Sequence, residues 1–459
     1  MDSRPVLPQE MPVLSMLDSY VSRAGERWHM PGHKGRRPEF GDFLHWSYDV
    51  TEIDEMLQTP NPVERSEELM ARSYGADRTW YSVAGATLPV LAGMLAAFPP
   101  GATVWVDRTM HRSVFGALVL GGYQVKWLYP SLVQAGLTLP VAKAPPAWEE
   151  ARGIVLTRPT YDGIAADIAP IIAACHAANG VVMVDEAHGS HWMVSPYPVS
   201  ALQLGADVVA HGVHKTQDAL TQTGLLHIQG HRVMADEVDR WWRVLATTSP
   251  SYLLLASLDR LQWARRQPHY AERWRAAAEA ALVLREDLAA AGWVIWQAWA
   301  ERQGYAADPL RLTVMGPGSA VEARVKRVGR VEKTTQDSCT FLLSPGQNFD
   351  ALKEALGPAP LVPSPQALNP MPYPALETAM SIRDAWLHPG RWVPLRDAVG
   401  LVAKDALTPY PPGVPVAVAG EVLTRNIVDW LLDWHAAGRA VIQGVKPQGD
   451  DLWVWVVEA

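Results

Sequence analysis

The sequence predicts an α/β fold, with a mostly parallel sheet in a large domain and a smaller α+β part after it. Short apolar runs alternate with helical stretches over residues 61–267, a pattern typical of parallel strands joined by crossover helices. The run 181–184 is apolar at every position, as expected for a strand buried on both faces. It leads into Asp185, and the next apolar run, 206–210, leads within a few residues to Lys215. Because ligands bind outside the carboxyl ends of such strands, we expect both side chains to face one crevice.

The amino-acid composition limits which classes of protein the chain can belong to. The 459 residues are 48% hydrophobic and 19% charged, which is typical of a globular chain with two or three domains. A formal charge of −8 without Lys/Arg clusters argues against nucleic acid as the partner. Two cysteines cannot form a disulfide framework and indicate a reducing compartment. No signal-peptide pattern opens the chain and no apolar stretch reaches the ~20 residues of a membrane span. We therefore expect a cytoplasmic protein without a membrane segment.

Changes in pattern divide the chain into four parts. An N-terminal arm carries a short helix at 12–20 and a basic Pro/Gly loop, HMPGHKG, at 29–35. A long helix expected at 269–291 separates the large domain from a small α+β domain, and a proline-rich connector precedes a C-terminal module. The predicted boundaries are 1–60, 61–267, 268–360 and 361–459.

Periodicity places the remaining elements. We expect strands at 79–83, 102–106, 153–157, 310–314 and 340–343, and helices at 64–74, 88–97, 168–178, 320–328 and 422–435. Ser251 is expected to cap the helix that follows it.

A turn of small residues joins the first strand to the helix at 88–97. It reads Ala84-Gly85-Ala86-Thr87, and such a turn exposes backbone N–H groups at the positive end of a helix dipole. Taken alone, it indicates a tight turn without a ligand. Placed in one chain with Asp185 and Lys215, it predicts a phosphate site.

An acid and a lysine at one rim fit one cofactor in particular. Pyridoxal 5'-phosphate (PLP) needs a lysine amine to bind its aldehyde and a carboxylate to keep its pyridine nitrogen protonated. A competing hypothesis is a metal site, since histidines recur at short spacing in the pairs 188/191, 211/214 and 227/231. Such spacing arises easily among 14 histidines, and no HExxH or paired CxxC accompanies it. We therefore predict no metal.

Five motifs carry a resemblance to a known family. They are HMPGHKG (29–35), DEAHGSH (185–191), HGVHKT (211–216), TTSPSYLLLASLD (247–259) and YPPGVP (410–415). Together they resemble the Orn/Lys/Arg decarboxylase family of fold-type I PLP enzymes. The resemblance implies an aspartate aminotransferase-like large domain, a small α+β domain and, at 361–459, a decarboxylase-family module.

The resemblance also implies roles for individual residues. Lys215 would hold the cofactor, Asp185 its ring nitrogen, and His111 and Ala187 its two ring faces. His188 and His214 would join Lys215 in catalysis, with His214 also beside the cofactor. Further cofactor contacts would come from Gly85, Ala86, Thr87, Thr248 and Ser249. The last two would reach a neighbouring subunit, which implies a homodimer or a higher homo-oligomer.

Two departures from the family's pattern concern the phosphate. Relatives carry hydroxyl residues in the turn and before the His-Lys pair, where this chain has Ala84, Ala86 and Gly212. A weaker or differently supported phosphate site follows from these changes.

The expected reaction is decarboxylation of lysine, ornithine or arginine to the amine and CO2, as in polyamine biosynthesis. The substrate would meet Tyr410 and a carboxylate; Glu421 is preferred over Asp384, Asp54 or a residue of a partner chain. One alternative is an aminotransferase, which needs an arginine to clamp the α-carboxylate, with Arg383 and Arg391 as candidates. Another is a PLP-binding protein that has lost catalysis.

Overall fold

The structure is a computed structural model that describes residues 10–23, 48–50, 56, 60–134, 137–360, 375–410, 413–436, 441–449 and 451–458. The HMPGHKG loop, Asp54 and Pro411-Pro412 lie outside these ranges, as does most of the predicted arm.

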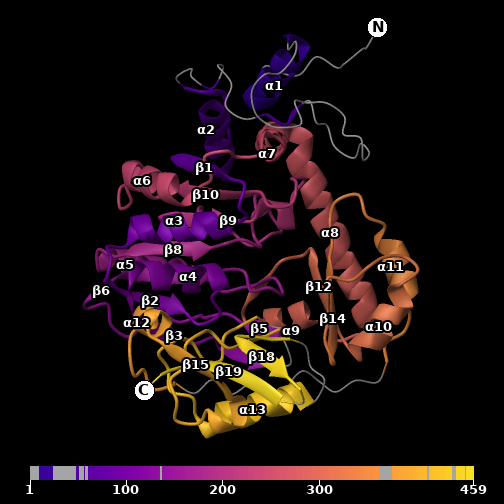
Figure 1. Cartoon of the computed structure of the whole chain (residues 1–459). Helices are drawn as coiled ribbons and strands as arrows, with labels where there is room; N and C mark the ends of the chain where they lie inside the picture. The colour runs from indigo at the N-terminus through magenta and orange to yellow at the C-terminus, as the bar shows by residue number, and fades with distance from the viewer. Residues whose placement is uncertain are drawn as a thin grey trace, which may run out of the picture.

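A seven-stranded sheet forms the centre of the large domain (Figure 1). Strands β9, β8, β6, β2 and β3 run parallel, whereas β10 is antiparallel to both β9 and the edge strand β1. The predicted mostly parallel sheet is confirmed. In spatial order the strands are β1 (Arg78–Ser82), β10 (Gly224–Ile228), β9 (Val208–His211), β8 (Val181–Asp185), β6 (Ala151–Thr157), β2 (Thr103–Asp107) and β3 (Gln124–Leu128).

Helices cover both faces of this sheet, and β8 shows why its sequence is apolar throughout. Val181 and Met183 pack into the cluster that contains the helices α3 and α4 on one face. Val182 and Val184 pack on the other face, against α5. The helices are α3 (Thr87–Ala97), α4 (Arg112–Gly121), α5 (Ala169–Ala177) and α6 (Ala235–Leu245).

Three helices close the β1 edge of the sheet. They are α1 (Pro12–Arg23), α2 (Pro62–Tyr74) and α7 (Tyr252–Arg265). Ser251 occupies the N-cap position of α7, but its hydroxyl makes no capping hydrogen bond, so the expected side-chain cap is absent. None of the helices in the described ranges is long and apolar enough to span a bilayer.

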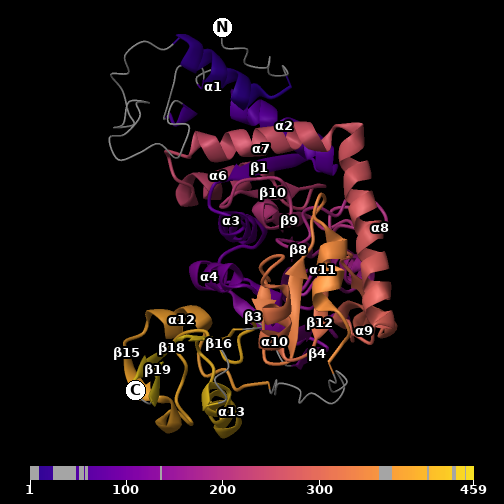
Figure 2. The ribbon, with the colours of Figure 1, turned by 90° about the vertical axis from the view of Figure 1, so that its right-hand side faces the viewer.

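The 23-residue helix α8 (Pro268–Ala290) runs along the side of the molecule to the small domain (Figure 2). There a three-stranded antiparallel sheet in the order β12-β14-β13 packs with short helices. These elements are α9 (Trp296–Arg302), β12 (Arg311–Met315), α10 (Gly318–Val325), β13 (Lys333–Thr334), β14 (Ser338–Leu342) and α11 (Phe349–Leu356). Pairing of β11 (Ala306–Ala307) with β7 (Ile164–Ala165) joins this domain to the large one.

The C-terminal module has a core of its own. Its sheet has the order β15-β19-β18, and along β19 every second residue is buried, as expected for a strand with one solvent face. The elements are α12 (Ile382–Leu387), β15 (Gly390–Pro394), β16 (Thr408–Pro409), α13 (Arg425–Ala436), β17 (Ile442–Gln443), β18 (Val445–Gln448) and β19 (Asp451–Val457). The hairpin of β4 (Leu132–Gln134) and β5 (Leu137–Leu139) follows β3 in the chain, and its Leu137 and Leu139 pack with Trp296 and Trp299 of α9.

Candidate active site

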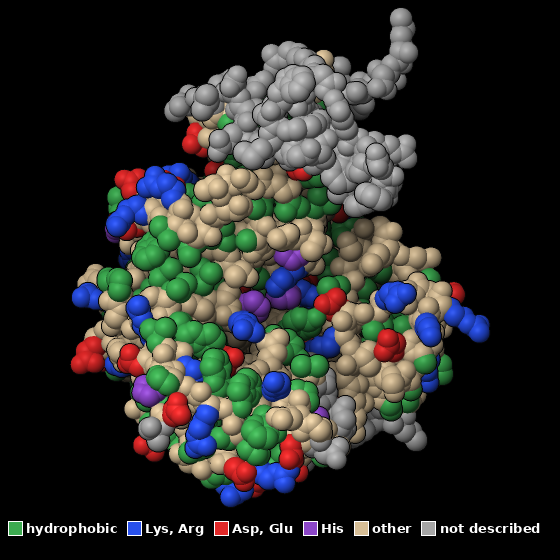
Figure 3. All heavy atoms as spheres, viewed as in Figure 1, with side chains coloured by type: hydrophobic (Ala, Val, Ile, Leu, Met, Phe, Trp, Pro, Cys, Tyr) green, Lys and Arg blue, Asp and Glu red, His purple; other side chains and the backbone are tan. Residues whose placement is uncertain are grey.

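A cavity of about 910 Å³ opens at the carboxyl ends of the parallel strands. Histidine side chains gather there in a hollow near the middle of the face seen in Figure 3. Most of the residues predicted for the site line it: Gly85, Ala86, Thr87, His111, Asp185, Ala187, His188, His214, Lys215 and Tyr410.

Lys215 ends a short 3-10 helix, Val213–Lys215, that follows β9. Its Nζ lies 3.0 Å from Nε2 of His188, which projects from the loop after β8. Desolvation by burial lowers the pKa of Lys215, against the opposing effect of the nearby Asp185 carboxylate. Burial also holds the pKa of His188 well below its usual range, with Lys215 and Arg311 adding to the shift. Burial thus shifts both groups toward their uncharged forms, and the uncharged amine is the nucleophilic form of a lysine.

Asp185 is the last residue of β8 and is buried. Its Oδ1 accepts a hydrogen bond of 3.1 Å from the N–H of Ala187, which fixes the carboxylate at the rim. The carboxylate is close enough to His111 and Lys215 to influence the pKa of both. This position suits a carboxylate that pairs with a protonated ring nitrogen in the cavity.

The small-residue turn forms the wall at the start of α3. Gly85 has a φ of +62°, a conformation that favours glycine, and α3 begins at Thr87 without a side-chain cap. The first N–H groups of that helix are thus open to an anion. The ring of His214 lies beside the turn, 3.7 Å from where a Cβ on Gly85 would be. Its Nδ1–H donates to the carbonyl of Thr223 at 2.6 Å.

His111 occupies the N-cap position of α4, and its Nδ1 accepts a hydrogen bond of 3.2 Å from the N–H of Ser113. The capping role and a position in the cavity wall therefore coexist. Burial lowers the pKa of His111, which favours the neutral ring. Together, the turn, Asp185, His111 and Lys215 form a donor set that could hold a phosphorylated pyridine aldehyde, and the residues present fit PLP.

Thr248 and Ser249 do not belong to this cavity. Both are exposed in the segment between α6 and α7. Neither is among the residues that line the cavity, so any role in cofactor binding requires a second subunit.

The expectation for Glu421 needs correction. Its carboxylate is buried and accepts two hydrogen bonds from the guanidinium of Arg108, of 2.9 and 2.7 Å. A third, of 2.8 Å, comes from the N–H of Val418. With its oxygens used in this way, Glu421 does not line the cavity and holds the C-terminal module against the large domain. Asp384 is likewise engaged, with the cap Ser381 of α12.

Three residues that sequence reasoning missed lie at the cavity. Tyr161 and Glu332 line it, and the hydroxyl of Tyr161 donates to the Glu332 carboxylate. Arg311, on β12, donates from Nη2 to Nδ1 of His188 at 2.9 Å. Tyr161 lies in the loop after β6, at the carboxyl end of a parallel strand. No local motif marks Glu332 and Arg311, because these two come from the small domain. Only the docking of that domain brings them to the strand ends.

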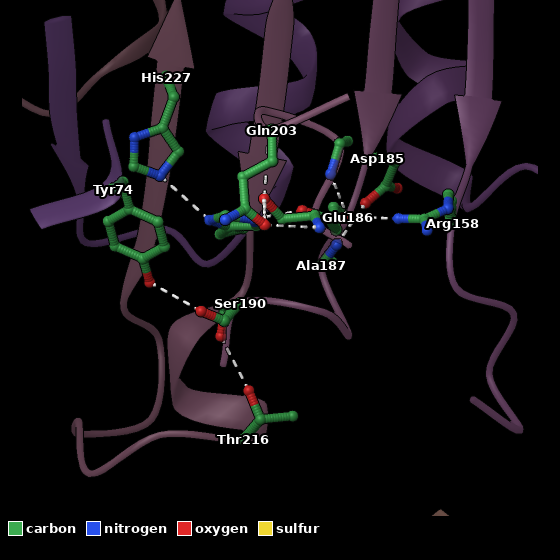
Figure 4. A network of polar contacts seen from close by, with 12 residues as sticks. Tyr74, Arg158, Asp185, Glu186, Ala187, Ser190, Gln203, Thr216 and His227 are labelled. Carbon is green, nitrogen blue, oxygen red and sulfur yellow. Dashed lines mark hydrogen bonds and ion pairs between the residues drawn. The ribbon is translucent and has the colours of Figure 1, made fainter. Parts of the chain in front are cut away.

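A buried polar network holds the strands behind the cavity (Figure 4). Glu186 pairs with Arg158 at 3.0 Å and accepts from Nε2 of His211 at 3.0 Å. His211 in turn contacts Nε2 of His227 at 3.0 Å, and His227 contacts Thr79 at 2.8 Å. These ring nitrogens are thus used within the protein. In the described part of the chain, no three His, Cys, Asp or Glu side chains converge as a metal site would require.

Comparisons with known proteins find similar chains along most of this sequence. Residues 11–303 match the family model described as Orn/Lys/Arg decarboxylase, major domain, and residues 365–458 match its C-terminal domain. The chain is 30% identical to an arginine decarboxylase of Bacillus subtilis, over 94% of this chain and 95% of that protein. It is 24% identical to the constitutive lysine decarboxylase of Escherichia coli, over 96% and 80%. The structure of that lysine decarboxylase superposes with a TM-score of 0.82 at 20% identity, covering 97% of this chain and 82% of the other.

Proposed function

The chain belongs to the Orn/Lys/Arg decarboxylase family, and from this premise we propose that it removes the α-carboxylate of a basic amino acid with PLP bound to Lys215. The observation that carries the proposal is the convergence of Lys215, Asp185 and the uncapped start of α3 on one cavity. When bound, PLP supplies an electron sink for the bond that breaks at Cα.

The chain's own residues would divide the work around the cofactor. The Lys215 amine would hold the cofactor aldehyde, and the Asp185 carboxylate would keep the ring nitrogen in its protonated form. His111 would pack on one ring face and Ala187 on the other. Lys215 and His188, in hydrogen-bond contact at 3.0 Å, are the candidates to return a proton to Cα after CO2 leaves.

For the substrate we propose arginine. Arginine decarboxylases of Bacillus subtilis, Halalkalibacterium halodurans and Bacillus anthracis are 28 to 30% identical to the chain over 94% of its length. The cationic side chain needs a carboxylate, and among the described residues lining the cavity the carboxylates are Asp185 and Glu332. Since Asp185 serves the cofactor, we assign the substrate side chain to Glu332, oriented by Tyr161, in place of Glu421.

The aminotransferase alternative gains no support from its candidate clamps. Arg383 donates to the carbonyl of Leu120 on the surface of α4, and Arg391 is exposed on β15. The alternative of lost catalysis was motivated by missing hydroxyls in the phosphate turn. Thr87 and Thr221 both line the cavity, so hydroxyl donors remain on that wall.

The proposal is tested by measuring CO2 release from arginine, lysine and ornithine in parallel, using purified protein with added PLP. We expect release from arginine, a cofactor absorbance band, and loss of both in Lys215→Ala. The band should survive in Arg383→Ala, a matched control on the surface. A keto acid product in place of CO2 would establish an aminotransferase, and a bound cofactor with no product from any substrate would support lost catalysis.

A further inference from the structure

Arg311, His188 and Lys215 form a continuous chain of polar contacts. Nη2 of Arg311 lies 2.9 Å from Nδ1 of His188, and Nε2 of the same ring lies 3.0 Å from Nζ of Lys215. Arg311 is 1% exposed and stands behind the cavity wall. It therefore reaches the lysine through the imidazole.

The chemistry of the three groups fixes where the hydrogens lie. A guanidinium has donors only, so Nδ1 of His188 must be the acceptor in its contact with Arg311. A neutral imidazole has one acceptor nitrogen and one N–H, so the hydrogen of His188 is on Nε2. That N–H points at Nζ of Lys215, and an amine accepts a hydrogen bond only when it is not protonated.

We infer that Arg311 is a positioning residue that sets the tautomer of His188 and thereby keeps the Lys215 amine in its uncharged, nucleophilic form. The inference rests on the proposed role of Lys215 in holding the cofactor. Because Arg311 belongs to the small domain, the Lys215 amine is kept uncharged in this way only when the small domain is docked on the large one.

The other charged groups around the lysine do not account for this state. Burial is the largest influence on the pKa of Lys215 and lowers it. Among the charged groups, Asp185 and Glu332 favour the protonated amine, whereas Arg311 opposes it. His188 is faced in turn by Lys215, Arg311, His111 and His214, all of which disfavour a charge on its ring. Arg311 is therefore the cation whose removal changes both the tautomer and the local field.

The fold holds Arg311 in place from two sides. Gly163 has a φ of +80°, and a Cβ there would lie 2.3 Å from Cγ of Arg311, so the arginine stem passes over a glycine. The carboxylate of Asp308, which is also buried, has the largest stabilising electrostatic effect on the Arg311 charge. Such support is needed because an unpaired buried guanidinium is costly.

The test measures the reactivity of Lys215 without cofactor. Cofactor-free protein is treated with formaldehyde and cyanoborohydride over a range of pH, and methylation of Lys215 is followed by mass spectrometry, with the exposed Lys326 as internal reference. In Arg311→Met the pH of half-modification should rise by about one unit or more, which is about a tenfold loss of reactive amine at neutral pH. Arg311→Lys, which keeps a donor and a charge, should restore much of the wild-type profile.

A second pair of variants distinguishes an effect of Arg311 that acts through the His188 tautomer from a direct effect of its charge on Lys215. In His188→Gln the relay is already cut, so adding Arg311→Met should shift the Lys215 profile by much less than it does in the wild type. Equal shifts in both backgrounds would overturn the inference in favour of a direct field effect. An unchanged profile with a raised KM would overturn it in favour of a carboxylate clamp, using the Nη1 that has no partner among the described residues. Failure of the wild type to trap PLP on Lys215 with borohydride would instead refute the proposed function itself.

Discussion

Arg108 and Glu421 form a buried ion pair in which each side chain is 2% exposed and the closest N–O distance is 2.7 Å. Arg108 follows β2 in the large domain, whereas Glu421 belongs to the C-terminal module. The same guanidinium also donates to the carbonyls of Pro415 and Val416, at 3.3 and 3.4 Å. Hydrogen bonds donated by one arginine thus anchor the module, which also supplies Tyr410 and Val414 to the cavity lining.

Removing the carboxylate should therefore cost stability before it affects substrate binding. We expect Glu421→Ala to lower the free energy of unfolding by about 3–5 kcal/mol, because it leaves the Arg108 charge buried and unpaired. Urea unfolding followed by tryptophan fluorescence measures this loss. The double variant Arg108→Met with Glu421→Leu should recover part of it, since no buried charge remains. A large rise in KM at unchanged stability would instead return Glu421 to the substrate site.

Glu332 should behave in the opposite way. In Glu332→Gln the cationic end of the substrate loses its charged partner, worth about 1.5–3 kcal/mol, so KM for arginine should rise by roughly 10- to 100-fold, with stability unchanged. The KM of Glu332→Asp for arginine should lie between the values of the wild type and of Glu332→Gln. Glu322→Gln is a matched control, because that carboxylate binds Thr334 and is absent from the cavity wall. Equal KM values in the wild type and in Glu332→Gln would mean that another group binds the cationic side chain of the substrate.

The fold was predictable because each of its signals is local. The apolar run that ends at Asp185 and the small-residue turn at Gly85 can each be recognised in a few consecutive residues. The observed ends of helices and strands differ from the predicted ones by a few residues; for example, α13 begins at Arg425 and not at 422. Such shifts are expected, because tertiary packing decides where a helix end frays.

The site was predictable only where a strand end supplied the residue. Asp185 ends one parallel strand, and His188 and Lys215 follow neighbouring parallel strands, so the sheet topology brings the three together. Glu421 was assigned to the substrate from its position after the YPPGVP loop. That position does not reveal that its carboxylate accepts hydrogen bonds from Arg108. Arg311 was invisible for a related reason: its partner, His188, is 123 residues away in the sequence.

Stability should fall with rising pH because of Glu67. Burial raises the pKa of this carboxyl from 4.5 to about 8, although the N–H of Tyr81 donates to it. A folded pKa above the unfolded value means that folding takes up a proton. The contribution of the protonated Glu67 to the free energy of unfolding is fully present below pH 4.5 and is lost as the pH rises through about 8. Glu67→Gln keeps the acceptor for Tyr81 and should flatten this dependence by a few kcal/mol at most.

The measurement for Glu67 is urea unfolding at several values between pH 5 and pH 9. The exposed Glu68, 58% accessible in its pair with Arg72, provides the control variant Glu68→Gln, which should follow the wild type. Parallel curves for wild type and Glu67→Gln would show that the carboxyl ionises in the folded state without penalty.

Thr248 and Ser249 make the last prediction, which concerns the proposed oligomer. Both hydroxyls are exposed and lie outside the cavity of their own chain, so they can contribute to cofactor binding only from a partner. We expect the double variant Thr248→Ala, Ser249→Ala to weaken PLP binding, so that it is inactive at low PLP concentration, and Lys215→Ala to abolish turnover. When the two proteins are unfolded, refolded together and assayed at that PLP concentration, about half of the dimers are mixed, and each mixed dimer regains one complete site, about a quarter of all sites. Activity of that order would establish a shared site. No recovery, from mixed dimers shown to form by mass spectrometry, would mean that the two hydroxyls act within their own chain or not at all.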